Sequence, residues 1–239
     1  MRALPVASIA LLLALGAPLH ADIIEARYAE PTARYTHGIL GDAIEHGALL
    51  IVVSRGLGGR KTLIVTLPEN RVFEDTAPRL ADVDNDGDME VIVVETDVAR
   101  GAQLAIYDET GKIAATPYIG TRFRWLAPVG VADLDGDGTI EIAYIDRPHL
   151  AKTLRVWRFE EGGLTPVVDL GGLTNHRIGE RDIAGGIRVC GSGPEMITAS
   201  ADWSVIMATR LRDGALETRP VGAHQDRKSF ARALRCADE

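Results

Sequence analysis

The sequence predicts an all-β fold, a small β-propeller with four blades of about four strands each. Three observations lead to this prediction. Two acidic stretches with the same spacing recur along the chain, a β-branched run follows each of them, and further short β-type runs end in glycine-containing turns. Four-stranded units that repeat at about 40–54 residues suggest a propeller. A two-sheet sandwich is the alternative, but it does not explain the repeat.

The two acidic stretches begin at Asp82 and Asp133, 51 positions apart. In both, Asp occupies positions 1, 3 and 5, Gly position 6 and Glu position 9. The residues concerned are Asp82, Asp84, Asp86, Gly87 and Glu90 in the first stretch, and Asp133, Asp135, Asp137, Gly138 and Glu141 in the second. The β-branched residues that follow, 91–94, and the apolar run 142–145 favour a buried strand after each loop.

Two degenerate copies flank these motifs. Glu195 takes the place of the position-9 glutamate in the last unit, and in the first unit Asp42 aligns with Asp82, so that Leu50 falls at position 9. We therefore expect blades at 34–75, 76–121, 122–174 and 175–222. They form a single domain over 22–239, closed by a tail at 223–239 that carries the one expected helix, near 229–235. A fifth blade built from residues 22–33 and the tail stays open.

Residues 1–21 have the pattern of a cleaved signal peptide. Arg2 precedes the apolar segment 9–15, and Ala21 stands before the expected cut. We therefore expect an exported protein, periplasmic or secreted. No later apolar run approaches the ~18 residues of a membrane span, so no membrane insertion is expected after cleavage.

The charge excludes one class of partner. The chain has a formal net charge of −8, and without Arg2 the mature chain has 25 basic and 34 acidic residues, which is −9. Nucleic-acid binding needs a basic face that releases counterions from phosphates, so it is not expected.

The chain has two cysteines, Cys190 and Cys236. An even pair in an exported protein predicts a disulfide, here between the last blade and the tail. Two buried free thiols are the alternative.

The acidic loops have the ligand pattern of a cation site. Three carboxylates, the position-7 carbonyl (Asp88 or Thr139) and the position-9 glutamate supply hard oxygen ligands, which Ca²⁺ prefers, and Mg²⁺ is a weaker candidate. An EF-hand would place its closing glutamate at position 12 before a helix, so this motif is not expected here. A solvated acidic turn is the remaining alternative.

The stretches "DVDNDGDMEVIVV" and "DLDGDGTIEIAYI" resemble the Ca²⁺-binding loops of FG-GAP/VCBS repeats, which build propellers similar to the head of integrin α subunits. The resemblance implies two Ca²⁺ ions and a binding or scaffold role. It also implies two ligand sets, Asp82, Asp84, Asp86, Asp88 and Glu90, and Asp133, Asp135, Asp137, Thr139 and Glu141.

The remaining candidates are less specific. The run 30–42 contains Tyr35 and His37 and can line one propeller face, and the three tryptophans are expected in the core. The expected function is a non-catalytic, calcium-stabilised binding module with a protein or carbohydrate partner. The alternatives are an enzyme acting on polysaccharides or esters, in which Tyr35 or His37 takes part, and a structural subunit of an envelope complex.

Overall fold

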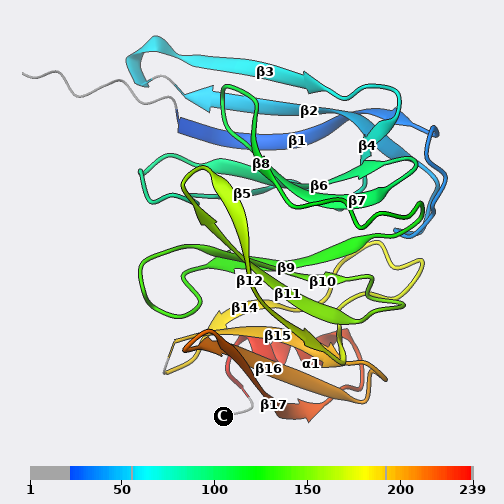
Figure 1. Ribbon diagram of the computed structural model, residues 1–239, viewed down its shortest axis with the longest axis vertical. Coiled ribbons are helices and arrows are strands. Elements are labelled where there is room, and N and C mark those ends of the chain that lie inside the picture. The colour runs from blue at the N-terminus through cyan, green and yellow to red at the C-terminus, as the bar shows by residue number, and fades with distance from the viewer. Residues whose placement is uncertain (1–21, 55, 192, 238–239) are drawn as a thin grey trace, which may run out of the picture.

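The structure, a computed structural model, describes residues 22–54, 56–191 and 193–237. Within them the chain is all-β with a single α-helix near the C-terminus, as predicted. The expected signal peptide lies outside the described residues. No helix in the described part of the chain is long and apolar enough to cross a membrane. Figure 1 shows four layers of strands that follow one another from the N-terminal to the C-terminal end of the chain.

The first unit begins earlier than expected. β1 pairs antiparallel with β2, and β3 pairs with the other edge of β2. The first unit therefore starts at residue 22 instead of 34, because β2 uses residues 22–32 as its partner, and these residues are not free for a fifth blade. The elements are β1 (Asp22–Thr32), β2 (Glu45–Ser54), the 3₁₀ helix η1 (Gly56–Gly58) and β3 (Arg60–Thr66).

The second unit is joined to the first by the short strand β4. β4 pairs with the far end of β6, and its Phe73 also pairs with His46 of β2, so one sheet of eight strands spans both units. The expected boundary at residue 76 therefore cuts off a strand of the second unit. The elements are β4 (Arg71–Phe73), β5 (Arg79–Ala81), β6 (Glu90–Asp97), β7 (Gly101–Tyr107) and β8 (Lys112–Ala115).

The third and fourth units are separate sheets of four and five strands. The third unit holds β9 (Leu126–Ala132), β10 (Glu141–Asp146), β11 (Thr153–Glu160) and β12 (Gly163–Gly171). The fourth unit holds β13 (Leu173–Thr174), β14 (Gly186–Val189), β15 (Pro194–Ser200), β16 (Val205–Arg212) and β17 (Ala215–Ala223). Every pairing in both sheets is antiparallel.

The run 91–94 of β6 is apolar at four successive positions, and both of its faces are buried. In β6, Val91 and Val93 pack in the core shared with the first unit, whereas Ile92 and Val94 pack in the core shared with the third. Successive side chains of a strand point to opposite faces, so a segment packed between two apolar cores favours apolar residues at consecutive positions. The β-branched run after the acidic loop is the result.

The four units form an open stack. Apolar cores lie between consecutive units, and a further core lies between the fourth unit and the helix α1 (Arg227–Leu234). Phe230 and Ala233 of α1 are buried on this outer face. Figure 1 places β3 at one end of the stack and β17 with α1 at the other, so the first and fourth sheets of the described structure do not meet in a ring.

The helix is the physical reason for the open end. A closed ring would cover the outer face of the fourth sheet with the first sheet, but α1 already buries it. Asp226 begins the helix with a capping box, since its side chain accepts hydrogen bonds from the backbone of Lys228 and Ser229. The tail therefore caps the stack and does not supply a closing strand.

Candidate functional site

A buried glutamate stands at or next to the start of one strand in every unit, namely β2, β6, β10 and β15. It lies across from the last residues of the preceding strand, at Thr32, Ala81, Ala132 and Arg188 in turn. The four glutamates are at most 5 % exposed. They are Glu45, Glu90, Glu141 and Glu195.

The register corrects the sequence alignment of the first unit. Glu45, and not Leu50, is the counterpart of Glu90, because Glu45 pairs with Thr32 as Glu90 pairs with Ala81. The connection in the first unit, residues 33–44, is longer than the acidic loop 82–89. An alignment without gaps cannot accommodate this longer connection, and so it put Leu50 instead of Glu45 at position 9. In the fourth unit the corresponding connection, between β14 and β15, covers only positions 190–193.

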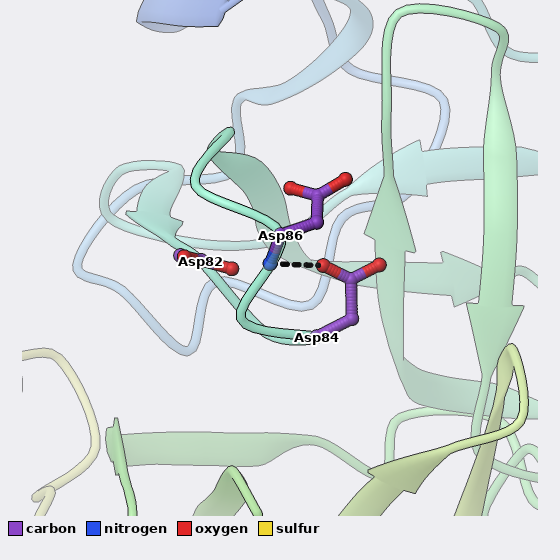
Figure 2. Close-up of side chains that lie close together, drawn as sticks. All are labelled: Asp82, Asp84 and Asp86. Carbon is purple, nitrogen blue, oxygen red and sulfur yellow. Dashed lines mark hydrogen bonds between the residues drawn. The ribbon is translucent and has the colours of Figure 1, made fainter.

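Loop 82–90 gathers three carboxylates around one point. Oxygen atoms of Asp82, Asp84 and Asp86 lie within 4.8 Å of one another, and Figure 2 shows their side chains on the same curl of the chain. Gly87 has a φ of +95° and donates its N–H to Asp82 Oδ2 at 3.1 Å. The loop needs glycine there because the left-handed region is unfavourable for other residues.

Glu90 closes this loop from the start of β6. Its Oε2 accepts the backbone N–H of Val83 at 2.8 Å, which ties the first turn of the loop to the strand. Burial raises the pKa of Glu90 to about 7, and the charge of Asp84 adds to this effect. The carboxylates therefore repel one another in a partly desolvated site.

Four of the loop carboxylates have no basic partner in the described part of the chain. Asp82, Asp84, Asp86 and Glu90 form no ion pair with a lysine or arginine among the described residues. Asp82 Oδ1 is buried and has no hydrogen-bond partner there. A divalent cation fits this set, because it would satisfy the unpartnered oxygen and cancel the repulsion.

Loop 133–141 repeats the same backbone turn. Gly138 donates to Asp133 Oδ2 at 3.0 Å, Thr139 donates to Asp137 Oδ1 at 2.8 Å, and Leu134 donates to Glu141 Oε2 at 2.8 Å. Oxygen atoms of Asp133, Asp135 and Glu141 lie within 4.8 Å of one another. The two loops also touch, since Asn85 Nδ2 donates to the carbonyl of Gly138 at 2.9 Å.

A guanidinium lies among the carboxylates of this second loop. Arg158 of β11 pairs with Asp135 at 2.7 Å, with Asp137 at 3.1 Å and with Glu141 at 2.6 Å. β11 runs beside β10 in a register that sets Arg158 directly opposite Glu141. The repeat pattern in the sequence does not indicate Arg158, although the pairing of the two strands is a signal that could have indicated it.

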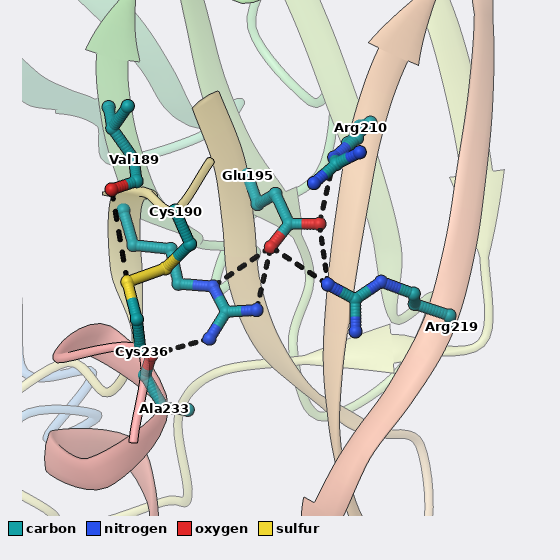
Figure 3. The surroundings of a disulfide bond; sticks show 8 residues. Val189, Cys190, Glu195, Arg210, Arg219, Ala233 and Cys236 are labelled. Atoms are coloured by element: carbon teal, nitrogen blue, oxygen red, sulfur yellow. Dashed lines mark hydrogen bonds and ion pairs between the residues drawn. A yellow bond between two sulfur atoms is a disulfide. The ribbon is translucent and has the colours of Figure 1, made fainter. Parts of the chain in front are cut away.

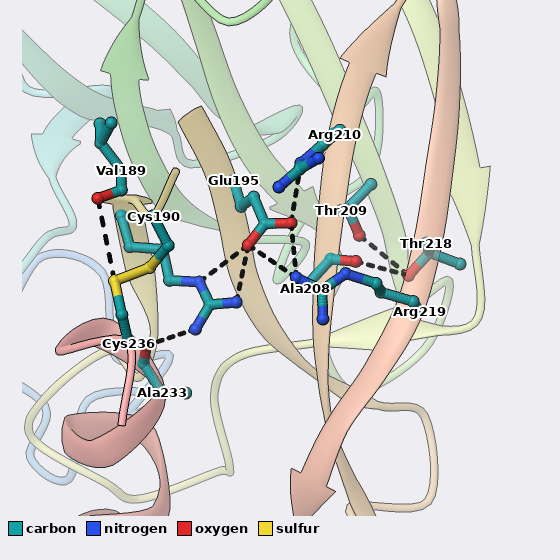
Figure 4. Close-up of polar contacts among 11 residues, drawn as sticks. Val189, Cys190, Glu195, Ala208, Thr209, Arg210, Thr218, Arg219, Ala233 and Cys236 are labelled. Carbon is teal, nitrogen blue, oxygen red and sulfur yellow. Dashed lines mark hydrogen bonds and ion pairs between the residues drawn. A yellow bond between two sulfur atoms is a disulfide. The ribbon is translucent and has the colours of Figure 1, made fainter. Parts of the chain in front are cut away.

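In the fourth unit arginines surround the equivalent glutamate. Arg188 is buried and contacts Glu195 at 2.6 Å, and Arg210 and Arg219 contact it at 2.8 and 3.0 Å. Figure 3 shows Arg210 and Arg219 on the same side of Glu195, and Figure 4 adds the neighbouring Thr209–Thr218 contact of β16 and β17. Burial alone would raise the pKa of Glu195, but the hydrogen bonds and charges of the arginines lower it.

The glutamate of the first unit has no basic partner in the part of the chain that the structure describes. Glu45 forms no ion pair among the described residues. Burial, and then the charge of Glu74, raise its pKa to about 9. Glu45 is therefore protonated at neutral pH, which removes the charge that the other three units balance in other ways.

The predicted disulfide is confirmed. Cys190 and Cys236 are bonded, with their Cα atoms 5.9 Å apart. The bond joins the turn before β15 to the end of α1, as Figure 3 shows. Arg188 Nη1 donates to the carbonyl of Ala233 at 2.7 Å, so the same arginine that holds Glu195 also holds the helix.

A separate cavity of about 190 Å³ lies where connections from three layers meet. Its walls come from the links β1–β2, β8–β9, β10–β11 and β13–β14. The exposed side chains of Leu150 and Ile178 stand at its edge. Phe123 and Arg147 on its wall have φ values of 57° and 46°, conformations that non-glycine residues rarely adopt.

Two histidines on the cavity wall are oriented by other groups. His37 Nδ1 lies 2.5 Å from Oε1 of the buried Glu74, and Thr96 donates to the other Glu74 oxygen at 2.7 Å. His149 Nε2 lies 3.1 Å from His176 Nδ1, and His176 Nε2 donates to the carbonyl of Glu180 at 2.9 Å.

These contacts determine the tautomers of the histidine pair. A carbonyl only accepts, so His176 carries its proton on Nε2, its Nδ1 accepts from His149, and Nδ1 of His149 keeps a lone pair. Burial, and then the neighbouring His176, lower the pKa of His149 to about 4. His149 is therefore neutral at neutral pH.

Other sequence candidates are structural. Tyr35 is fully buried, and its hydroxyl accepts the backbone N–H of Phe123 at 2.8 Å. Trp125 donates to the carbonyl of Glu74, and Trp157 donates to the hydroxyl of Tyr144. Of the expected pair, only His37 reaches the cavity.

The comparison with protein families bears on the segment that carries both acidic loops. Residues 82–144 match the model of the FG-GAP-like repeat. This segment is therefore similar to an FG-GAP-like repeat. The matched FG-GAP segment runs from the first residue of loop 82–90 into β10 and so includes both loops. No curated protein matches the chain. The resemblance drawn from the two loops is thereby confirmed, whereas the role of the loop residues as ligands stays a prediction.

Proposed function

We propose that this chain is an exported, calcium-stabilised interaction module of the FG-GAP type, with a partner bound on the connections between its sheets. The observation that carries the calcium proposal is loop 82–90. The carboxylates of Asp82, Asp84 and Asp86 converge there, and among the described residues neither they nor Glu90 have a basic partner. One buried oxygen of Asp82 is also unpartnered among these residues. The Cys190–Cys236 bond supports export, since disulfides persist in oxidising compartments.

The residues that would hold the ion are Asp82, Asp84, Asp86, Glu90 and the carbonyl of Asp88. These are oxygen donors, which match Ca²⁺. When bound, the ion would neutralise the loop, and its binding energy would add to the folding energy. Because Asn85 links this loop to Gly138, an ordered first loop also supports the second.

Thermal unfolding of the full chain tests the metal proposal. We expect millimolar Ca²⁺ to raise the midpoint and EGTA to lower it, and we expect Asp84→Asn to abolish the response. Asp169→Asn is the matched control, because Asp169 lies on β12 outside both loops and should leave the response unchanged. Equal midpoints with calcium and with EGTA would rule the proposal out.

The cavity between the sheets is the partner site that the geometry supports best. Leu150 and Ile178 give it an apolar edge, and Arg124 on its wall forms no ion pair among the described residues. A partner with a compact apolar body would bury the apolar edge of the cavity. A negative charge on that partner, carried by a protein side chain or an acidic sugar, would neutralise Arg124.

A pull-down from an envelope extract tests this surface. We expect the wild type to retain a partner that Arg124→Glu and Ile178→Ser lose. Ile64→Ser is the matched control, since Ile64 is an exposed isoleucine of β3 away from the cavity. Capture of the same partner by all variants would place the interaction elsewhere and would favour a structural subunit of an envelope complex.

A second candidate function rests on the His37–Glu74 pair. A buried carboxylate that orients an imidazole toward a cavity is an arrangement for general acid–base chemistry, so a hydrolase or lyase acting on polysaccharides or esters is the alternative. Screening such substrates with the wild type and with His37→Gln tests it. Turnover that survives in His37→Gln would exclude this role for the pair.

A further inference from the structure

The carboxylates of loop 133–141 are paired in a way that does not fit a calcium site. We infer, on the basis of the proposed function, that the chain binds one divalent cation, at loop 82–90, and that Arg158 is the built-in cation of loop 133–141. The loop in the third unit keeps the carboxylates of the repeat but satisfies them with a guanidinium from the neighbouring strand.

The contacts of Arg158 use the oxygens that a metal would need. Its guanidinium donates to Asp135 Oδ2 at 2.7 Å and to Glu141 Oε1 at 2.7 Å, and it pairs with Asp137 Oδ2 at 3.1 Å. Three of the four acidic residues of the loop are thereby engaged. A divalent ion at the same carboxylates would face the positive charge of Arg158 at close range, which opposes binding.

The first loop differs at the corresponding strand position. β7 ends with Tyr107 opposite Val91, so the next residue, Asp108, stands nearest to the position opposite Glu90. Asp108 turns its carboxylate to the N–H groups of Thr110 and Gly111. The second unit thus has an acid where the third has Arg158, and it supplies no cation from β7.

The two loops also differ in their own charge. Position 7 is Asp88 in the first loop and Thr139 in the second, so the second loop has one carboxylate fewer. A loop with fewer negative charges and an internal positive charge attracts a divalent ion less strongly. Both differences therefore act in the same direction.

The fourth unit shows that this fold accepts guanidinium groups as permanent counter-charges. Thr209 pairs with Met196, and the same antiparallel register continued by one residue places Arg210 opposite Glu195, as Arg158 is placed opposite Glu141. Arg210 contacts Glu195 at 2.8 Å, and the buried Arg188 contacts it at 2.6 Å. There the acidic loop is absent altogether, and arginines alone hold the glutamate.

Calcium stoichiometry of the full chain, measured by equilibrium dialysis and calorimetry, tests the inference. We expect one ion per chain in the wild type, none in Asp84→Asn and two in Arg158→Gln. Arg155→Gln is the matched control, because Arg155 lies on the same strand but pairs with Asp146 and Asp169 outside the loop. The control should bind one ion.

A second variant keeps the test decisive if Arg158→Gln does not fold. Asp135→Asn should leave the single wild-type ion bound with unchanged affinity, because that ion sits in the other loop. Two ions in the wild type, or loss of binding in Asp135→Asn, would overturn the inference and leave the proposed function standing. No ion in the wild type and in Arg158→Gln would instead overturn the proposed function.

Discussion

Arg158 of β11 lies directly opposite Glu141 of β10, and its guanidinium contacts that carboxylate at 2.6 Å. Each of the four units balances the charge of an equivalent buried glutamate in a different way, and this pair is the way used in the third unit. Each unit buries a glutamate at the start of a strand, and a buried charge must be paired or neutralised. The four units use, in turn, protonation, an acidic loop suited to a cation, one arginine and three arginines.

The glutamate of the first unit predicts a pH dependence of stability. Its pKa rises from 4.5 to about 9 on folding, so the folded state binds the extra proton. Stability is therefore lost as the pH rises from about 4.5 to about 9. Glu45→Gln removes this loss. We therefore expect the unfolding free energy of the variant, relative to that of the wild type, to be up to about 3 kcal/mol higher at pH 7 than at pH 4.

Urea midpoints of the wild type and of Glu45→Gln, measured from pH 4 to pH 9, check this prediction. Glu69→Gln is the control, because Glu69 is exposed. Two parallel curves for Glu45→Gln and the wild type would show that Glu45 is already ionised in the folded state.

The disulfide predicts that reduction loosens the helical cap. The bond closes a loop of 46 residues, which is worth about 4 kcal/mol at most in loop-closure entropy. We expect dithiothreitol, or Cys190→Ser with Cys236→Ser, to lower the unfolding free energy and to speed hydrogen exchange in α1. The calcium response should persist, since loop 82–90 lies in another unit. An unchanged urea midpoint would contradict the prediction.

Arg188 predicts a large cost when its charge is removed. Arg188→Met leaves Glu195 with the two more exposed arginines and removes the donor to Ala233, so we expect a loss of about 3–5 kcal/mol. Adding Glu195→Gln should restore part of it, because the buried charge is then gone. Urea unfolding checks both variants against the exposed Arg212→Met. Equal losses in the single and double variants would show that the lost packing, and not the charge, sets the cost.

Gly101 predicts a steric effect beside the cavity. A Cβ at this residue would lie 2.4 Å from the carbonyl of Thr121 and 2.7 Å from that of Arg124, whereas Gly162 has a similar positive φ and open space. Gly101→Ala should cost about 2–4 kcal/mol, and Gly162→Ala about 1 kcal/mol. Thermal unfolding compares the two variants. Similar midpoints would mean that the segment 121–124 yields freely.

The acidic motifs and the β-branched runs after them are local patterns, and they were sufficient for the all-β class, the FG-GAP resemblance and the loop residues that converge. The disulfide could also be predicted from the sequence, because two cysteines allow only one pairing. The boundaries of the four units could be predicted less well from the sequence. Residues 22–32 pair with β2, and β4 bridges two units, because hydrogen bonds between strands join segments that no local pattern connects.

The tertiary structure alone decided which buried glutamate receives which counter-charge. Arg158 reaches Glu141 and Arg188 reaches Glu195 through strand register, and a shift of one residue would turn either side chain to the other face. It also decided that the stack ends in a helix, since α1 covers the face that a closed ring would need. The sequence by itself determined the local loop chemistry and the strands, whereas the three-dimensional packing determined which charges meet.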